Sequence, residues 1–295
     1  MENTRFLLVG TVSNVEQKLP GDVGRILGSL KKIGRVDTFL VESDSKDNTL
    51  RVLKELGSKD KTFGYESMGE LGQKIPNRVE RIRFCRNRYV EYIRKNYSVT
   101  PWDYIIVADL DGMNSAITPK KITSSIRKSS RWDACFSNQT FGYYDLYALR
   151  AKGWVEADCF EELVRLKELA PFNQKWKSSL IGFFSAFMHF DKLRDQAIYS
   201  MMRFLRGDLV PVESAFGGFA IYKPEVFLKF DYSSSGKSLK GKCEHLDLHA
   251  KCVRSGLNLL IDPKLTNCHW NEYNLNRIKV VRFIREFKKY LNRLK

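Results

Sequence analysis

The sequence has no long apolar run, and its cysteines are few and scattered. The longest apolar-rich stretch, "LIGFFSAFMHF" at 180–190, falls well short of the ~20 residues that span a bilayer. The apolar run after Arg5 is only four residues long, whereas a secretory signal needs a longer apolar region. The six cysteines show no CxxC spacing, which argues against a zinc site or a disulfide framework. The sequence therefore predicts a cytoplasmic protein with reduced thiols that is not integral to a membrane.

Acidic residues are in deficit, with 34 Asp and Glu against 50 Lys and Arg. The resulting net charge of +16 favours an anionic partner, which could be nucleic acid, an anionic membrane or a phosphorylated substrate. No recognised nucleic-acid-binding motif is present, so no nucleic-acid partner is expected. A nucleic-acid-binding protein stays as the alternative from a different class.

Much of the excess positive charge lies in the last segment, 274–295, which holds eight Lys or Arg and one Glu. Its apolar residues fall at helical spacing, which predicts a basic amphipathic C-terminal helix after a domain spanning 1–273. Such a helix is typical of peripheral attachment to an anionic membrane surface. A terminal helix packed on the domain, with its basic face in solvent, is the alternative.

Apolar runs and helical patterns alternate along the first half of the chain. They predict strands at 5–12, 36–45 and 104–108 and helices at 22–34, 46–58 and 78–97. This order indicates an α/β domain with a mostly parallel central sheet and helices on both faces. Further strands expected within 132–150, 210–223 and 257–270 make the sheet mixed, with no clear boundary between the halves.

Two aspartates, Asp109 and Asp111, follow the buried strand at 104–108. Residues two apart along a strand point to the same side, so the two carboxylates are expected to converge. Ligands of open α/β sheets bind outside the carboxyl ends of the strands, where this pair lies. A cation or a protein donor between the carboxylates would relieve their repulsion. The alternative is a cap or an Asx turn after the strand.

Four motifs in order resemble the GT-A glycosyltransferases, which use nucleotide-diphosphate sugars. They are "VGTVSNV" at the end of the first strand, "ESDSKDNT" at 42–49, "DLD" at 109–111, and "GG" at 217–218 followed by "CEHLD" and "CHW". Taken together they look closest to capsule-associated mannosyltransferases. The resemblance covers roughly 5–270 and implies a GT-A-like fold.

The resemblance also implies a hexosyltransferase that depends on Mn²⁺ or Mg²⁺ and uses a GDP- or UDP-linked donor. Asp109 and Asp111 would hold the metal, with His269 completing its coordination and Asp109 also reaching the donor. A loop histidine without a ligand role is the alternative for His269. The remaining donor-binding residues would be Gly10, Thr11, Val12, Glu42, Ser43, Asp44, Arg83, Arg86, Gly217 and Gly218. For these the alternatives are a helix cap at 42–44, a solvated basic helix and an ordinary glycine turn.

The acceptor, a glycan hydroxyl, would meet the "CEHLD" segment. If a helix begins there, Glu244 and Asp247 share a face, and either could be the base that an inverting enzyme needs. A retaining enzyme would use the leaving phosphate instead. Sugar nucleotidyltransferases begin with a glycine-rich loop that carries Arg and Lys, and this sequence lacks one. A non-catalytic glycan-binding module on the same fold is a third hypothesis.

Overall fold

The computed structural model describes residues 3–143, 145–156, 158–159, 161, 203, 205–234, 243–269, 284 and 288. The predicted boundary at 273 and nearly all of the predicted C-terminal helix lie outside these residues. In the described residues, no helix is long and apolar enough to cross a membrane.

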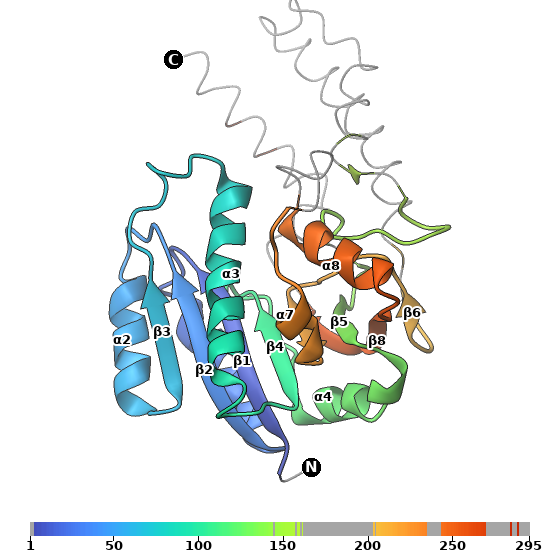
Figure 1. Cartoon of the computed structure of the whole chain (residues 1–295), viewed down its shortest axis with the longest axis horizontal. Helices are drawn as coiled ribbons and strands as arrows, with labels where there is room; N and C mark the ends of the chain where they lie inside the picture. The colour runs from blue at the N-terminus through green and yellow to red at the C-terminus, as the bar shows by residue number, and fades with distance from the viewer. Residues whose placement is uncertain are drawn as a thin grey trace, which may run out of the picture.

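The first half of the chain alternates strands and helices as its sequence pattern predicts (Figure 1). Its elements are β1 (Arg5–Val12), α1 (Leu19–Leu30), β2 (Arg35–Glu42), α2 (Thr49–Lys59), β3 (Phe63–Ser67), α3 (Arg78–Asn96), β4 (Tyr104–Ala108), α4 (Pro119–Ile126) and a short 3-10 turn (Ser129–Arg131). The sequence analysis missed β3 and α4, and it began α1 three residues too late. Pro20 lies in the first turn of α1, where its missing N–H costs no hydrogen bond.

In its described residues, the second half adds four strands to the same sheet and contributes two helices. These are β5 (Ala134–Gln139), β6 (Val210–Pro211), β7 (Phe219–Tyr222), α7 (Glu225–Lys229), α8 (Glu244–Arg254) and β8 (Leu259–Cys268). The sheet has eight strands in the order β3-β2-β1-β4-β7-β5-β8-β6. β3, β2, β1 and β4 run parallel to one another, whereas β7 runs antiparallel to both β4 and β5. The predicted α/β class and mixed, mostly parallel sheet are confirmed.

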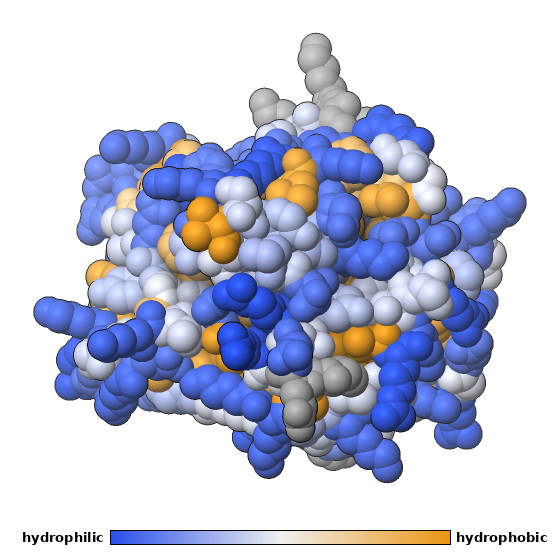
Figure 2. All heavy atoms as spheres, turned by 60° about the horizontal axis from the view of Figure 1, so that its bottom comes forward, coloured by the Kyte–Doolittle hydropathy of each residue, from blue (hydrophilic) through white to orange (hydrophobic). Residues whose placement is uncertain are grey.

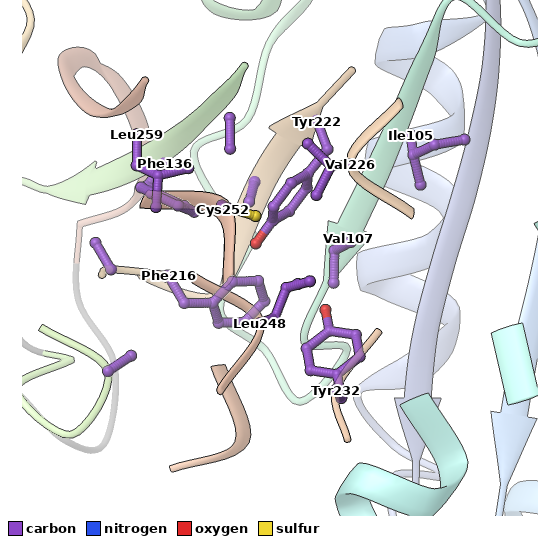
Figure 3. Packing of buried hydrophobic residues seen from close by; sticks show 14 of the residues in the cluster. Ile105, Val107, Phe136, Phe216, Tyr222, Val226, Tyr232, Leu248, Cys252 and Leu259 are labelled. Atoms are coloured by element: carbon purple, nitrogen blue, oxygen red, sulfur yellow. The ribbon is translucent and has the colours of Figure 1, made fainter. Parts of the chain in front are cut away.

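Alternate residues of β1 enter two separate cores, because successive strand side chains point to opposite faces. Leu7 and Val9 pack in the core beneath α3, α7 and α8, and Phe6 and Leu8 pack in the core beneath α1, α2 and α4. Figure 3 shows the first of these cores where Val107 of β4, Tyr222 of β7 and Leu248 of α8 meet. Both faces of the sheet are therefore covered, and the open edge at its carboxyl ends is left for a site.

Candidate active site

The "DLD" segment leaves β4 directly beside the double glycine that precedes β7. The backbone N–H of Asp109 donates to the carbonyl of Gly218 at 3.0 Å, because β4 and β7 are antiparallel neighbours. Two of the predicted motifs, more than one hundred positions apart in the sequence, are thus joined at one point. Figure 1 shows α3 and α8 on the same face of the sheet, where both pack in one core.

Arg86 of α3 reaches this point and contacts residues from four other segments. Its Nε donates to Glu244 at 2.9 Å, and one terminal nitrogen lies 3.4 Å from Asp109. The rings of Phe216 and Tyr232 lie against the guanidinium, with 5.2 Å and 5.6 Å from its carbon to the ring centroids. The side chain is only 4% exposed, so Arg86 is a fixed positive charge rather than a solvated one.

Arg83, one turn earlier on α3, forms a second buried pair. It donates to Asp247 at 2.5 Å, and Glu80 lies equally close to its other terminal nitrogen. The Asp247 side chain has no solvent exposure. Glu244, one turn away on α8, bonds to Arg86, and Arg86 also contacts Asp109. The helix that the sequence analysis made conditional does begin at Glu244. Its Glu244 pairs with Arg86 of α3, and its Asp247 pairs with Arg83.

Asp109 is buried among other charged groups, with Arg86, Asp111 and Glu244 around it. Burial is the main cause that raises the pKa of Asp109 to about 7, and the charges of Asp111 and Glu244 raise it further against the opposing effect of Arg86. The site therefore disfavours a full set of ionised carboxylates. A cation bound among them would relieve that cost.

Asp145 is a further acidic residue here that the sequence analysis missed. It accepts from the N–H of Gly217 at 3.2 Å. Burial, followed by the charges of Asp109 and Glu244, raises its pKa to about 6. Nothing in "GYYDLY" distinguishes this aspartate from one in an ordinary loop. Its place in the site depends on the course of the chain after β5.

The Gly217–Gly218 turn is held from several directions. The Gly217 carbonyl accepts hydrogen bonds at 2.8–3.0 Å from Ser137, Gln139 and Asn267. Its φ is +75°, and a Cβ there would lie 2.7 Å from the carbonyl oxygen of Ser137. Only glycine fits this position, because the backbone conformation and the lack of space both exclude a side chain.

Replacing Gly217 with alanine should therefore destabilise the fold by more than the backbone strain of about 1–3 kcal/mol. Gly256 is a matched control, because its φ of +77° is nearly the same and no atom lies within 4 Å of the added Cβ. Chemical denaturation should give a larger loss for Gly217→Ala than for Gly256→Ala. Equal losses would mean that the crowding around Gly217 has no energetic effect.

The "ESDS" turn lies at the carboxyl end of β2, at the same edge of the sheet. Glu42 is 1% exposed, and its two oxygens accept from the Ser45 N–H at 3.0 Å and the Ser67 hydroxyl at 2.5 Å. Asp44 has a φ of +59°, accepts from the Gly72 N–H at 2.7 Å and lies 3.5 Å from Arg81. Helix α2 begins after this turn with Asn48 as its N-cap residue. Glu42 and Asp44 thus hold the turn after β2 against the end of β3 and the segment that follows it, and do not cap α2.

The other predicted donor-side residues lie next to this turn. The Ser43 hydroxyl contacts the Cys85 thiol, and the Ser43 N–H donates to the Val12 carbonyl at 3.3 Å. Thr11 is half-buried beside Val12 at the end of β1. A Cβ on Gly10 would lie 2.6 Å from the carbonyl oxygen of Ala108, so glycine lets β1 and β4 approach here.

His269 lies past the end of β8, where its Nδ1 shares a short hydrogen bond with the Thr140 hydroxyl. Within the described residues, no three His, Cys, Asp or Glu side chains come together in a way that could hold a metal ion. His269 therefore does not form a three-residue set with the aspartates. Two carboxylates suit a cation that takes its remaining ligands from substrate phosphates, as Mg²⁺ commonly does.

His249 lies in the core behind the site and bridges two elements. Its ring nitrogens pair with the Ser214 hydroxyl and the Tyr222 hydroxyl, both at 2.9 Å. Burial, and then the charge of Arg86, lowers the pKa of His249 to about 3. Its neighbour His245 stacks on Phe216, and burial likewise lowers the pKa of His245. Both imidazoles are therefore neutral in the fold.

This burial should make the protein sensitive to acid. Between pH 6.5 and about 3 the folded chain binds fewer protons at His249 than the unfolded chain does. The free energy of unfolding is then full above pH 6.5 and falls as the pH drops, by up to ~1.4 kcal/mol per pH unit for one such histidine. When the free energy of unfolding is measured by urea denaturation from pH 7 to pH 4, it should fall less steeply with pH for His249→Leu than for the parent chain. The same slope in both would contradict a neutral, buried His249.

Comparisons with known proteins were made for both sequence and structure. No protein-family profile matches the sequence, and no curated protein matches it either. One similar solved structure is the mannosyltransferase PcManGT from Pyrobaculum calidifontis in complex with GDP-Man and Mn²⁺. It shows 11% identity and a TM-score of 0.45 over 98% of this chain and 65% of that one.

Two others are structures of S. aureus TarS. TarS 1–349 in complex with UDP-GlcNAc shows 9% identity and a TM-score of 0.30 over 46% of this chain and 34% of that one. TarS 1–349 alone shows 10% identity and a TM-score of 0.32 over 63% and 55%. This chain spans less than two thirds of the length of these structures. With TM-scores below 0.5, these likenesses carry no argument about its activity.

Proposed function

We propose that this protein is a metal-dependent glycosyltransferase that moves a hexose from a nucleotide-diphosphate sugar to a glycan hydroxyl. The observation that carries the proposal is the meeting of Asp109, Arg86 and Glu244 beside the Gly217–Gly218 turn. This meeting lies at the carboxyl end of β4, where α/β sheets bind their ligands. Carboxylates for a cation, a fixed arginine and a backbone turn without side chains are what a sugar diphosphate requires.

In this proposal Asp109 and Asp111 hold Mn²⁺ or Mg²⁺ together with the donor diphosphate. The ion would neutralise the negative charge that develops on the leaving diphosphate. The raised pKa of Asp109 is compatible with a cation here, because burial disfavours its charged form and a bound cation would favour that form. His269 stays a predicted third ligand, and its Nε2 could serve while Nδ1 keeps the hydrogen bond to Thr140.

The donor would extend from the sheet edge towards β2. The turn at 42–44 would meet the nucleoside of the donor, which could be GDP-linked or UDP-linked. Gly217 and Gly218 would let the backbone approach the hexose closely. Arg86 would keep Glu244 and Asp109 in place as the donor binds, and the ends of β1 and β2 at Gly10, Thr11, Val12 and Ser43 would support the nucleoside side.

On the acceptor side we propose a division of roles between the two carboxylates of α8. Glu244 lies beside Asp109 and is the better candidate for the base of an inverting reaction. Asp247 has no exposure and pairs with Arg83, so it would act by holding α3 against α8. A retaining reaction, in which the leaving phosphate accepts the proton of the acceptor hydroxyl, would need neither as a base.

A panel of nucleotide sugars scored by thermal shift, with and without Mn²⁺, tests the proposal. One GDP- or UDP-linked sugar should raise the melting temperature more with Mn²⁺ than with a chelator, because the ion joins the protein carboxylates to the diphosphate. Stabilisation by no member of the panel, with or without Mn²⁺, would count against a donor site. Stabilisation by one sugar without hydrolysis or transfer would favour the non-catalytic glycan-binding module.

We also propose that the basic segment at 274–295 attaches the protein peripherally to anionic membrane surfaces of the cytoplasm. The proposal rests on the charge and apolar spacing of the sequence. On the face of the domain in Figure 2, the hydrophobic atoms of the described residues form small areas among hydrophilic ones.

Co-sedimentation with vesicles containing phosphatidylserine should therefore weaken as salt rises and disappear when the chain ends at Tyr273. Neutral vesicles are the control. Binding that survives the truncation would rule out this segment as the anchor.

A further inference from the structure

The loop that carries Asp109 and Asp111 is held from outside the proposed active site. Its first residue is fixed on both sides, because the Asp109 N–H donates to Gly218 and the Asp109 carbonyl accepts from Asn114 at 2.6 Å. Its last residues are fixed to β8, because the Ala116 N–H donates to the Asn267 carbonyl at 2.8 Å. The middle of the loop, next to Asp111, needs a separate partner.

Asp22 of α1 supplies that partner. Its Oδ2 accepts from the N–H of Gly112 at 2.7 Å, across ninety positions of sequence. Asp22 is 2% exposed, and Arg25 lies 3.9 Å from its other carboxylate oxygen. A buried carboxylate with so distant a counter-ion is unfavourable, and its hydrogen bonds to the loop are what offset the cost. Burial is also the main cause that raises the pKa of Asp22, against the opposing effect of those bonds.

Gly112 is shaped for this contact. Its φ is +99°, and the side chain of Lys18 lies 3.4 Å from the place where a Cβ would be. The backbone after Asp111 therefore turns sharply and passes under the start of α1. The acceptor that Asp22 provides fixes the direction of the Gly112 N–H. It thereby also fixes the direction in which the Asp111 side chain points.

We infer that Asp22 is a positioning residue that sets the affinity of the Asp109–Asp111 pair for a divalent cation through its hydrogen bond to Gly112. This inference rests on the proposed function. Groups that orient metal ligands from behind typically change metal affinity by about 10–100-fold when they are replaced. Asp22 touches neither the nucleotide nor the acceptor in this arrangement, so its effect falls on the cation.

The test measures Mn²⁺ binding directly. Thermal shift is followed against Mn²⁺ concentration at a fixed level of GDP or UDP, whichever gives the larger Mn²⁺-dependent shift with the parent chain. Asp22→Val removes the acceptor, and the Mn²⁺ concentration at half effect should rise about 10-fold or more. Asp22→Asn keeps an acceptor oxygen and should stay within about threefold of the parent chain, because the hydrogen bond to Gly112 survives.

Val23→Ala is the matched control, because Val23 is the next residue of α1 and its apolar side chain packs in the core without any hydrogen bond to Gly112. It should lower the melting temperature through a cavity and leave the Mn²⁺ midpoint unchanged. If Asp22→Val does not fold, Asp22→Ser carries the same expectation, since its side chain is too short to reach Gly112 and leaves room for water.

The outcomes separate the inference from the function beneath it. A parent-like Mn²⁺ midpoint in Asp22→Val or Asp22→Ser would overturn the role of Asp22 while leaving the proposed function in place. An equal loss in Asp22→Asn would assign the effect to charge or to the hydrogen bonds from Asn114, and would overturn the role of the bond to Gly112. If the parent chain itself shows no Mn²⁺-dependent shift with GDP or UDP, the proposed function fails, and the inference fails with it.

Discussion

Replacing Asp111 with asparagine should remove Mn²⁺-dependent donor binding and lower transfer by about 10²–10³-fold, because an ion on the diphosphate contributes several kcal/mol to the transition state. The fold should survive, since Asp111 is half-buried in the loop after β4 and lies outside both cores. The measurements are initial rates with the donor found by the nucleotide-sugar panel, and thermal shift with that donor at several Mn²⁺ concentrations.

Asp103 gives a matched control at the opposite end of the same strand. Its Oδ2 accepts from the Arg5 N–H at 2.7 Å, a bond that asparagine can also accept. Asp103→Asn should therefore retain both the Mn²⁺ response and the transfer rate. Full transfer by Asp111→Asn in the presence of a chelator would refute metal dependence. Loss in both variants would indicate a general effect on β4.

The parts of the fold that the sequence predicts best are those with strong periodicity. β1, β4 and α3 begin and end within a residue of the expected positions, because long apolar or amphipathic stretches mark their limits. β3 was missed because "FGYES" is short, half-buried and without clear alternation. α4 was missed because "PKKITSSI" carries only two apolar side chains on its buried face.

The site divides in the same way between local motifs and tertiary contacts. The position of "DLD" at a strand end follows from a local pattern, whereas a helix starting at Glu244 was only a condition of the sequence-based hypothesis. The pairing of Arg86 with Glu244, and of Arg83 with Asp247, depends on α3 and α8 meeting across more than 150 residues. Asp22 and Asp145 lie in no motif. Their roles arise from which chain segments cross, which a single sequence does not encode in a readable form.

The two carboxylates of α8 should respond differently when their charge is removed. Asp247→Asn leaves Arg83 buried without its closest counter-charge, which should cost about 3–5 kcal/mol of the free energy of unfolding. Glu80 limits the loss, because it also lies within 2.5 Å of Arg83. Glu244→Gln should instead lower turnover by ~10²-fold or more if Glu244 is the base for the acceptor hydroxyl. Denaturation curves and initial rates below the melting temperature separate the two effects.

A double variant checks that the Asp247 effect comes from an unpaired charge. Arg83→Met combined with Asp247→Leu replaces both partners, whose side chains are 6% and 0% exposed, with apolar groups. It should recover much of the stability that Asp247→Asn loses, because no buried charge is left without a partner. If the double variant is no more stable than Asp247→Asn, the pair does more than neutralise charge.

Near-normal turnover in both Glu244→Gln and Asp247→Asn, with donor affinity intact, would mean that neither carboxylate is a base. A retaining reaction, with the leaving phosphate as proton acceptor, would then explain transfer without an enzyme base.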